Sequence, residues 1–305
     1  MVMFVADEVG PVEGIDHYTR YVAGAELNVS LGLSRLGHQV TYVTRLGEDP
    51  FGHYIYNLMQ DADLDTSATT FDTAHPTGFQ LKSKVVEGDP QVVYFRKNSS
   101  ASRLSPDDIA QLDLSSVNHV HVTGIPLALS ASSRAATFDL IERARQAHIL
   151  LTFDPNLRPS LWSDPETMVK TIQEAASRCD IVFPGIQEGK ILTGHADERE
   201  IAKSYRDFGV RGVIVKLGAE GAYLDMDGKT VYIPGYRVEK VVDTVGAGDG
   251  FAVGVIHGLL NHLPLEEAVR QGNAIGAMQV MVAGDNEGLP NKATLEAFLT
   301  QESGR

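Results

Sequence analysis

The sequence predicts an α/β fold: a doubly wound, mostly parallel sheet flanked by helices, with a small β-sheet lid. Short apolar runs alternate with helix-patterned segments along most of the 305 residues. Alternation at this spacing is typical of βαβ units, whose parallel sheet is covered on both faces. Polar residues and glycines follow the apolar runs, at the strand ends where such sheets bind ligands. Two stretches, about 3–22 and 77–97, break the alternation.

Five apolar runs are the expected strands: QVTYVTRLG (39–47), HVHVTGI (119–125), HILLTFDPN (148–156), DIVFPG (180–185) and GVIVKLG (212–218). Residues 131–147 and 165–178 have the periodicity of helices. Residues 77–97 resemble a hairpin that turns at EGDP, and a small sheet over an α/β body often serves as a lid that excludes water. Because no repeat or linker divides the chain, we expect one domain over residues 1–305, with lid strands from about 3–22 and 77–97.

Composition excludes several classes of function. The formal net charge of −14 argues against general binding to nucleic acid or to a membrane surface, both of which favour a basic face. The first residues lack the basic and apolar segments of a signal peptide, and no apolar run reaches the ~18–20 residues of a membrane span. Cys179 is the single cysteine, so no intramolecular disulfide can form. We expect a soluble, cytoplasmic protein.

The stretch DTVGAGDGF, residues 243–251, precedes an apolar helical segment. Gly246 and Gly248 allow close approach of the backbone to a ligand, and the helix start adds N–H donors and a positive dipole end, which suits a phosphate. Asp249 fits either an N-cap or a base that removes a proton from a hydroxyl, and position alone leaves both open. Neither a dinucleotide fingerprint nor a P-loop is present, because the glycine spacing fits neither.

The string DTVGAGD resembles the C-terminal signature of the ribokinase-like (PfkB) carbohydrate kinases. The string AGAELNVSLGLSRLG, residues 23–37, resembles the sugar-side motif of that family, and KLGAEGA lies between the two. The resemblance extends from about residue 15 to residue 290. It implies the ribokinase-like fold and ATP-dependent transfer of a phosphoryl group with Mg²⁺, in which protein groups mainly position the reactants and stabilise charge.

The resemblance also implies roles for individual residues. Asp249 would be the catalytic base, the backbone N–H groups of Gly246, Ala247 and Gly248 would form the anion hole, and Asp243 and Thr244 would order the loop. Gly185 stands where the family commonly has Asn, so Glu188 alone would organise Mg²⁺, directly or through water. A monovalent-cation site near this loop and residues 283–288 is compatible with the likeness. The implied nucleotide-binding residues are Asn156, Lys216, Gly218, Gly221, Ala222, Thr244, Gly246, Gly248 and Asn273.

Two arginines indicate which kind of sugar accepts the phosphoryl group. Arg96 closes the expected hairpin and shares a strand face with Tyr94, while Arg158 follows an expected strand end. Arginine forks pair with carboxylates, so two of them at one pocket indicate an acidic sugar. The strings AGAELN, YFRKNSSAS, TGIPLALS, DPNLRPSLW and AGDNEG resemble the family members that phosphorylate the 6-hydroxyl of 2-keto-3-deoxygluconate. That likeness implies an Entner–Doudoroff-type or uronate-degrading route, with sugar contacts from Gly24, Asn28, Tyr94, Phe95, Arg96, Arg158, Asp249 and Asp285.

Two alternatives stay open. A kinase of the fructokinase or ribokinase type would keep the fold and mechanism with a neutral sugar. A non-catalytic nucleotide or sugar sensor would keep only the scaffold, and Asp249 in an intact GAGD loop argues against it. The exposed edge of 77–97 would need covering, so we expect a homo-oligomer that forms through the lid. His119 and His121 fit ordinary sheet positions, since no matched metal set accompanies them.

Overall fold

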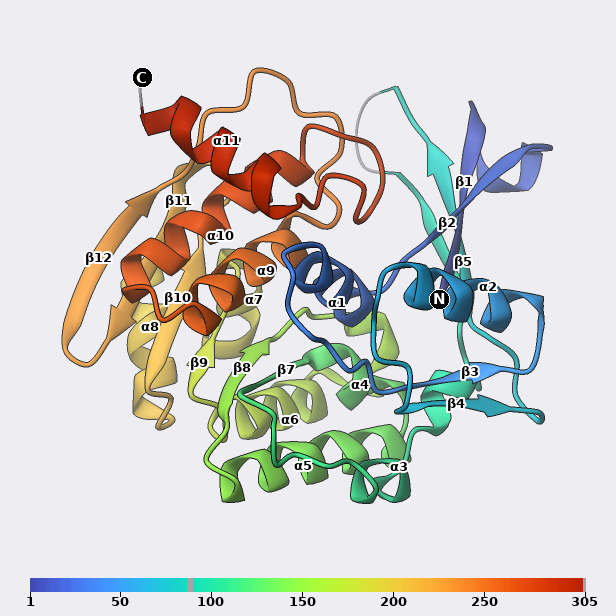
Figure 1. Cartoon of the computed structure of the whole chain (residues 1–305), viewed down its shortest axis with the longest axis horizontal. Helices are drawn as coiled ribbons and strands as arrows, with labels where there is room; N and C mark the ends of the chain where they lie inside the picture. The colour runs from blue at the N-terminus through green and yellow to red at the C-terminus, as the bar shows by residue number, and fades with distance from the viewer. Residues whose placement is uncertain (87–89, 304–305) are drawn as a thin grey trace.

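The computed structural model describes residues 1–86 and 90–303, so residues 87–89 of the expected hairpin turn lie outside it. Its main sheet has six strands in the order β12-β11-β10-β9-β8-β7 (Figure 1). The first four along the chain run parallel, and the last two are antiparallel. The expectation of a mostly parallel α/β sheet is therefore confirmed. The strands are β7 (His119–Thr123), β8 (Leu150–Asp154), β9 (Ile181–Val182), β10 (Gly212–Lys216), β11 (Gly221–Met226) and β12 (Lys229–Pro234).

Helices cover both faces of this sheet, as β10 illustrates. Val213 and Val215 of β10 belong to one buried cluster and Ile214 to another, because successive side chains of a strand point to opposite faces. One cluster includes side chains of α4 (Gly124–Leu129), α5 (Ala131–Gln146), α6 (Pro165–Ala176), α7 (Ile186–Thr193) and α8 (Glu198–Asp207). The other includes side chains of α1 (Ala25–Arg35), α9 (Ala247–Leu260), α10 (Leu265–Gln279) and α11 (Lys292–Ser303).

Several expected strands end earlier than the apolar runs did. The run 119–125 stops at Thr123, because the Thr123 hydroxyl accepts the N–H of Ile125 and caps α4 instead. The run 180–185 forms only Ile181–Val182; Pro184 has no N–H with which to extend the ladder. Helix α6 fits its expected span more closely, since Asp164 caps it and Pro165 occupies the first turn.

A second sheet, called sheet A here, comes from the two stretches that break the alternation. Its strands have the order β2-β1-β5-β6 and project from the body at the upper right of Figure 1. A third buried cluster joins sheet A to α1 and α2 (Pro50–Asp61). The strands of sheet A are β1 (Val2–Val9), β2 (Tyr18–Val22), β5 (Phe79–Lys84) and β6 (Val92–Phe95).

The run 39–47 lies outside both sheets. It contributes only β3 (Thr44–Gly47), which pairs in parallel with β4 (Thr69–Asp72). A five-residue helix, α3 (Pro106–Ala110), packs against α5. The remaining short helical turns are η1 (Val12–Gly14), η2 (Ser100–Arg103), η3 (Pro159–Leu161) and η4 (Gly218–Glu220). Within the described residues, no helix has the length and apolar character needed to cross a bilayer.

Helices α9 and α10 pack with their backbones in near contact. A Cβ built on Gly254 of α9 would lie 2.3 Å from the carbonyl oxygen of Gln271, and one on Gly258 would lie 2.5 Å from the Cβ of Ala268. Only glycine permits this approach. Because α9 begins with the GAGD loop, this packing also fixes where that loop lies relative to the sheet.

We predict that Gly254→Ala lowers the free energy of unfolding by about 1–3 kcal/mol, since the added methyl group overpacks against rigid backbone. Urea denaturation followed by circular dichroism would measure the change. Gly14→Ala is the matched control, because the nearest atom to its Cβ would be 4.0 Å away. Equal stability of the Gly254 and Gly14 variants would contradict the proposed close packing.

Candidate active site

Asp249 lies in the first turn of α9, on the loop that the sequence singled out. The N-cap position belongs to Gly246, so the capping role considered for Asp249 is wrong. Its carboxylate instead accepts the side-chain amide of Asn28 at 2.8 Å and that of Asn156 at 3.4 Å. These two asparagines come from α1 and from the segment after β8. Both carboxylate oxygens are therefore held by neutral donors, and the group is oriented without an ion-pair partner among the described residues.

The environment of Asp249 favours its protonated form more than water does. Burial raises the pKa of Asp249 to about 7, and the amide of Asn28 opposes that shift by stabilising the anion. The charge of Asp154 raises the pKa further, while Lys216 lowers it. A carboxyl group that titrates near neutral pH is suited to accept a proton in a reaction at that pH.

The loop backbone before Asp249 is tightly constrained. Gly246 has a φ of 78°, and a Cβ at this position would lie 2.1 Å from the carbonyl oxygen of Asp285. Both the left-handed conformation and the close contact require glycine. The contact brings the 283–288 segment against the start of α9, so these two parts of the predicted site are adjacent.

Lys216 supplies a buried positive charge beside this loop. Its Nζ donates to Asp154 at 2.6 Å, and a Cβ built on Gly248 would lie 3.5 Å from the same Nζ. Burial tends to lower the pKa of Lys216, but the charges of Asp154 and Glu188 outweigh it and raise that pKa. Lys216 therefore stays protonated. It ends β10 and Asp154 ends β8, so both lie at the carboxyl edge of the main sheet.

The carboxylate of Glu188 forms hydrogen bonds with the backbone of two separate loops. Its Oε1 accepts the N–H of Leu157 and its Oε2 accepts the N–H of Gly185, each at 2.8 Å. Burial raises the pKa of Glu188, against the attraction of Lys216. Gly185, which departs from the family pattern, thus contributes its backbone N–H to the carboxylate at the start of α7.

The described residues contain no cluster of three or more side chains able to hold a metal ion. Glu188 and Asp249 nevertheless offer hard oxygen donors near the loop. Mg²⁺ usually binds through one or two carboxylates and takes its other ligands from phosphates and water. The residues present fit an ion held in that way. Glu188 is the residue that the resemblance implies for it.

Arg96 is buried and incompletely paired. Its side chain is 5% exposed, its guanidinium lies 4.1 Å from the ring centre of Tyr94, and its Nε and Nη2 have no hydrogen-bond partner among the described residues. Burial lowers the pKa of Arg96, the tyrosine opposes this, and the charge of Arg158 lowers it further. A buried guanidinium with two nitrogens left unpaired is costly unless an anion pairs with it.

Asp285 lies in the same electrostatic neighbourhood. Burial raises its pKa to about 6, and the charges of Lys82 and Arg158 oppose the shift. Its Oδ1 has no hydrogen-bond partner within the described part of the chain. Arg158 itself donates to the carbonyl oxygen of Leu157 at 2.9 Å. The charge of Arg158 thus acts on both Arg96 and Asp285, and each of these two residues keeps polar atoms without a partner among the described residues.

The other residues predicted for the sugar and the nucleotide lie outside the contacts described so far. Gly24, with a φ of 139°, begins α1, and Thr244 is exposed in the loop. Phe95 does not lie on the face of Tyr94 and Arg96: it is 48% exposed and stacks on Phe79.

On the nucleotide side, the amide of Asn273 donates to the carbonyl oxygens of Ile233 and Pro234. The remaining nucleotide-side residues, Gly218, Gly221 and Ala222, lie where η4 meets β11.

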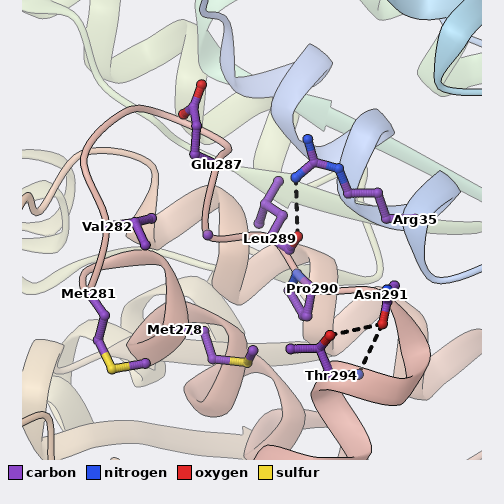
Figure 2. Close-up of a pocket in the computed structure, with 10 residues that line it drawn as sticks. Arg35, Met278, Met281, Val282, Glu287, Leu289, Pro290, Asn291 and Thr294 are labelled. Atoms are coloured by element: carbon purple, nitrogen blue, oxygen red, sulfur yellow. Dashed lines mark hydrogen bonds between the residues drawn. The ribbon is translucent and has the colours of Figure 1, made fainter.

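Figure 2 shows a pocket at a different place, beyond the end of α10. The volume of this hollow is about 650 Å³. Arg35 of α1 crosses it and donates to the carbonyl oxygens of Asn286 and Leu289. The hollow contains none of the predicted sugar or nucleotide residues, although Glu287 and Gly288 belong to the 283–288 segment considered for a monovalent cation. Arg35 serves there to brace the segment that carries Asp285. It is lined by Arg35, Met278, Met281, Val282, Glu287, Gly288, Leu289, Pro290, Asn291 and Thr294.

A glycine loop at a helix start, a buried lysine and a carboxylate titrating near pH 7 meet at the carboxyl edge of a parallel sheet. These features define the class of α/β enzymes that hold an anion against a helix start. Within that class, residues 1–292 match the model of the pfkB family carbohydrate kinases, and the chain belongs to this family.

Three similar proteins span almost the whole chain. The 2-dehydro-3-deoxygluconokinase of Bacillus subtilis (strain 168) is 45% identical over 99% of this chain and 94% of its own length. The crystal structure of a PfkB protein from Polaromonas sp. JS666 has a TM-score of 0.88 and 42% identity, over 97% of this chain and 96% of that one. A fructokinase double mutant from Vibrio cholerae O395, solved with fructose, ADP and potassium ion bound, has a TM-score of 0.87 and 29% identity, over 98% and 95%.

We predict that Glu188→Gln destabilises the protein by about 1–3 kcal/mol, because an amide offers one acceptor where two backbone N–H groups require two. Denaturant midpoints of the two proteins would measure the change. Glu174→Gln is the control, since the side chain of Glu174 forms an exposed pair with Arg178. A Glu188 variant as stable as the control would show that these hydrogen bonds contribute little.

Proposed function

We propose that the chain transfers the γ-phosphoryl group of ATP to the 6-hydroxyl of 2-keto-3-deoxygluconate, also called 2-dehydro-3-deoxygluconate. The product would be 2-keto-3-deoxy-6-phosphogluconate. The observation that carries the proposal is the buried guanidinium of Arg96, whose Nε and Nη2 have no partner among the described residues and which also feels the charge of Arg158. A neutral sugar would leave this charge without a counterion, whereas a sugar carboxylate would pair with it.

Similarity supports an acidic acceptor over a neutral one. The Bacillus relative, named for a sugar acid, is 45% identical, whereas the Vibrio fructokinase is 29% identical at nearly the same coverage. The two arginines add a physical reason. A kinase for fructose or ribose stays the main alternative, because it would keep Asp249 and its loop and change only the sugar side.

In this proposal, Asp249 and the backbone of the loop have different roles in phosphoryl transfer. Asp249, oriented by Asn28 and Asn156, accepts the proton of the attacking hydroxyl. The N–H groups of Gly246, Ala247 and Gly248 and the positive end of α9 stabilise the charge that develops on the transferring group.

Lys216, whose Nζ lies close to Gly248 of the loop, adds a fixed positive charge in a site of low dielectric. Mg²⁺, when bound with the nucleotide, would neutralise part of the phosphate charge, and Glu188 is the residue placed to orient it.

We assign sheet A the role of a lid over the sugar side, since its strand β6 carries Tyr94 and leads directly into Arg96. Its outer strands, β2 and β6, are edges within the described residues, and Phe95 is exposed there. Such edges favour pairing with a second copy. We therefore propose a homo-oligomer formed through sheet A, acting in the cytoplasm in an Entner–Doudoroff-type or uronate-degrading route. Sedimentation velocity would measure the assembly.

We predict that Asp249→Asn lowers kcat by about 10²–10⁴-fold and leaves ATP binding intact, because only the general base is lost. In the unmodified enzyme, kcat/KM should rise with pH through about 7, since the carboxyl must be ionised to accept a proton. Steady-state kinetics from pH 5.5 to 9 and calorimetric titration with an ATP analogue would measure both. Asp207→Asn is the control. A fully active Asp249 variant would remove the base from the mechanism.

We predict that Arg96→Met lowers kcat/KM for 2-keto-3-deoxygluconate by about 10- to 100-fold, the equivalent of one charge-assisted hydrogen-bonded pair. Methionine keeps most of the side-chain volume, so packing on Tyr94 is largely preserved. The exposed Arg270→Met is the control. Equal losses on fructose and on the sugar acid would argue against recognition of the carboxylate.

The test of the whole proposal is a coupled ADP-release assay with Mg²⁺-ATP and 2-keto-3-deoxygluconate, fructose and ribose. Turnover confined to the keto acid is the expected result. Turnover on the neutral sugars would support the fructokinase or ribokinase alternative. No turnover on all three, together with tight binding of nucleotide, would favour the sensor.

A further inference from the structure

Lys82 is a buried cation in sheet A that the catalytic scheme above does not use. It lies in the middle of β5, opposite Val5 of β1 and Val92 of β6. Its side chain shares a face with Gln80 and lies opposite that of Phe79, because side chains alternate along a strand. The residue is only 5% exposed. A lysine held inside a sheet in this way is rare unless a specific anion pairs with it.

That anion belongs to the loop before α9. Lys82 Nζ donates to Oδ2 of Asp243 at 2.7 Å, and the two side chains are 7% and 18% exposed. The other oxygen of Asp243, Oδ1, accepts the N–H of Val245 at 3.1 Å. One carboxylate thus connects sheet A with the backbone that leads into Gly246. The two residues are 161 positions apart in the chain.

Lys82 also acts on the segment on the other side of Gly246. After burial, its charge is the largest influence on the pKa of Asp285, which it lowers, whereas Asp243 raises that pKa. The carbonyl oxygen of Asp285 is the atom that a Cβ on Gly246 would meet. The ammonium ion therefore pairs with the carboxylate of Asp243 and also acts, through its charge, on that of Asp285. Without it, Asp243 and Asp285 would repel each other in a poorly solvated place.

We propose that Lys82 is a positioning residue: its ammonium ion holds the 243–248 loop in place against sheet A. Sheet A is itself anchored on α1 and α2 by the third buried cluster, so it is the order of the 243–248 loop that depends on this ion pair. The kinetic part of this inference rests on the function proposed above. The structural part, order in the loop, does not.

Kinetics of charge-removing variants test the role. Lys82→Met should lower kcat by about 10- to 100-fold, the range expected when reacting groups are displaced by about 1 Å, with KM for the sugar acid changed less than threefold. Lys82→Arg should recover most of the activity. In Lys82→Ala, ethylammonium at millimolar concentration should restore turnover. Lys84→Met is the matched control, because Lys84 lies on the same strand and is exposed.

Hydrogen exchange followed by mass spectrometry tests the loop directly and needs no turnover. Amides of residues 241–250 should exchange at least tenfold faster in Lys82→Met than in the unmodified protein or in Lys84→Met. Asp243→Asn, which breaks the pair from the loop side, should produce the same increase, and the double variant should add little to it. The Asp243 variant also covers the case in which Lys82→Met does not fold.

The outcomes separate the two proposals. Unchanged exchange in the loop for both single variants, or a uniform rise in exchange over the whole chain, would overturn the role of Lys82. An unchanged kcat in Lys82→Met, or a loss of turnover in Lys82→Ala that ethylammonium does not restore, would do the same. An unmodified enzyme inactive on every sugar would overturn the proposed function, while the exchange data would still decide about Lys82.

Discussion

The ion pair between Lys216 and Asp154 is the interaction on which the rest of the site depends. Three carboxylates, the buried Asp154 and the half-buried Glu188 and Asp249, lie within the electrostatic reach of this one ammonium group. Carboxylates brought together away from water repel one another and favour protonation. Lys216 permits their proximity, and the parallel sheet provides the reason they meet, because β8 and β10 end at the same edge. The charge pattern is thus a result of topology as much as of residue type.

The site also shows a conflict between stability and chemistry. Burial holds Asp249 at a pKa of about 7, so its folded form favours the neutral carboxyl. The stabilisation tied to that neutral form is complete at pH values below the unfolded pKa, and is lost as the pH rises through about 7. The ionised group that would act as base is therefore the less stable one. Close packing of α9 against α10 compensates by fixing the loop with contacts that do not titrate.

Much of this organisation was predictable from local sequence, and the remainder was not, for identifiable reasons. The alternation of apolar runs predicted the main sheet, and DTVGAGD located the helix start, because both signals lie within a few neighbouring residues. Strand ends were overestimated where a cap or proline intervened, as at Thr123 and Pro184. The contacts of Lys82 and Glu188 could not be predicted, since they join segments distant in sequence. The stacking of Phe95 on Phe79 also needed the strand register.

Sequence separation has a consequence for how the enzyme is made. The contact between Asn28 and Asp249 spans 221 residues, and that between Asn28 and Asn286 spans 258. Closing such long loops slows folding, and the N-terminal part of a chain leaves the ribosome first. Helix α1 and sheet A must therefore wait through most of translation for the partners that bury their polar side chains. The nascent chain is expected to need protection from aggregation for longer than one built from local contacts.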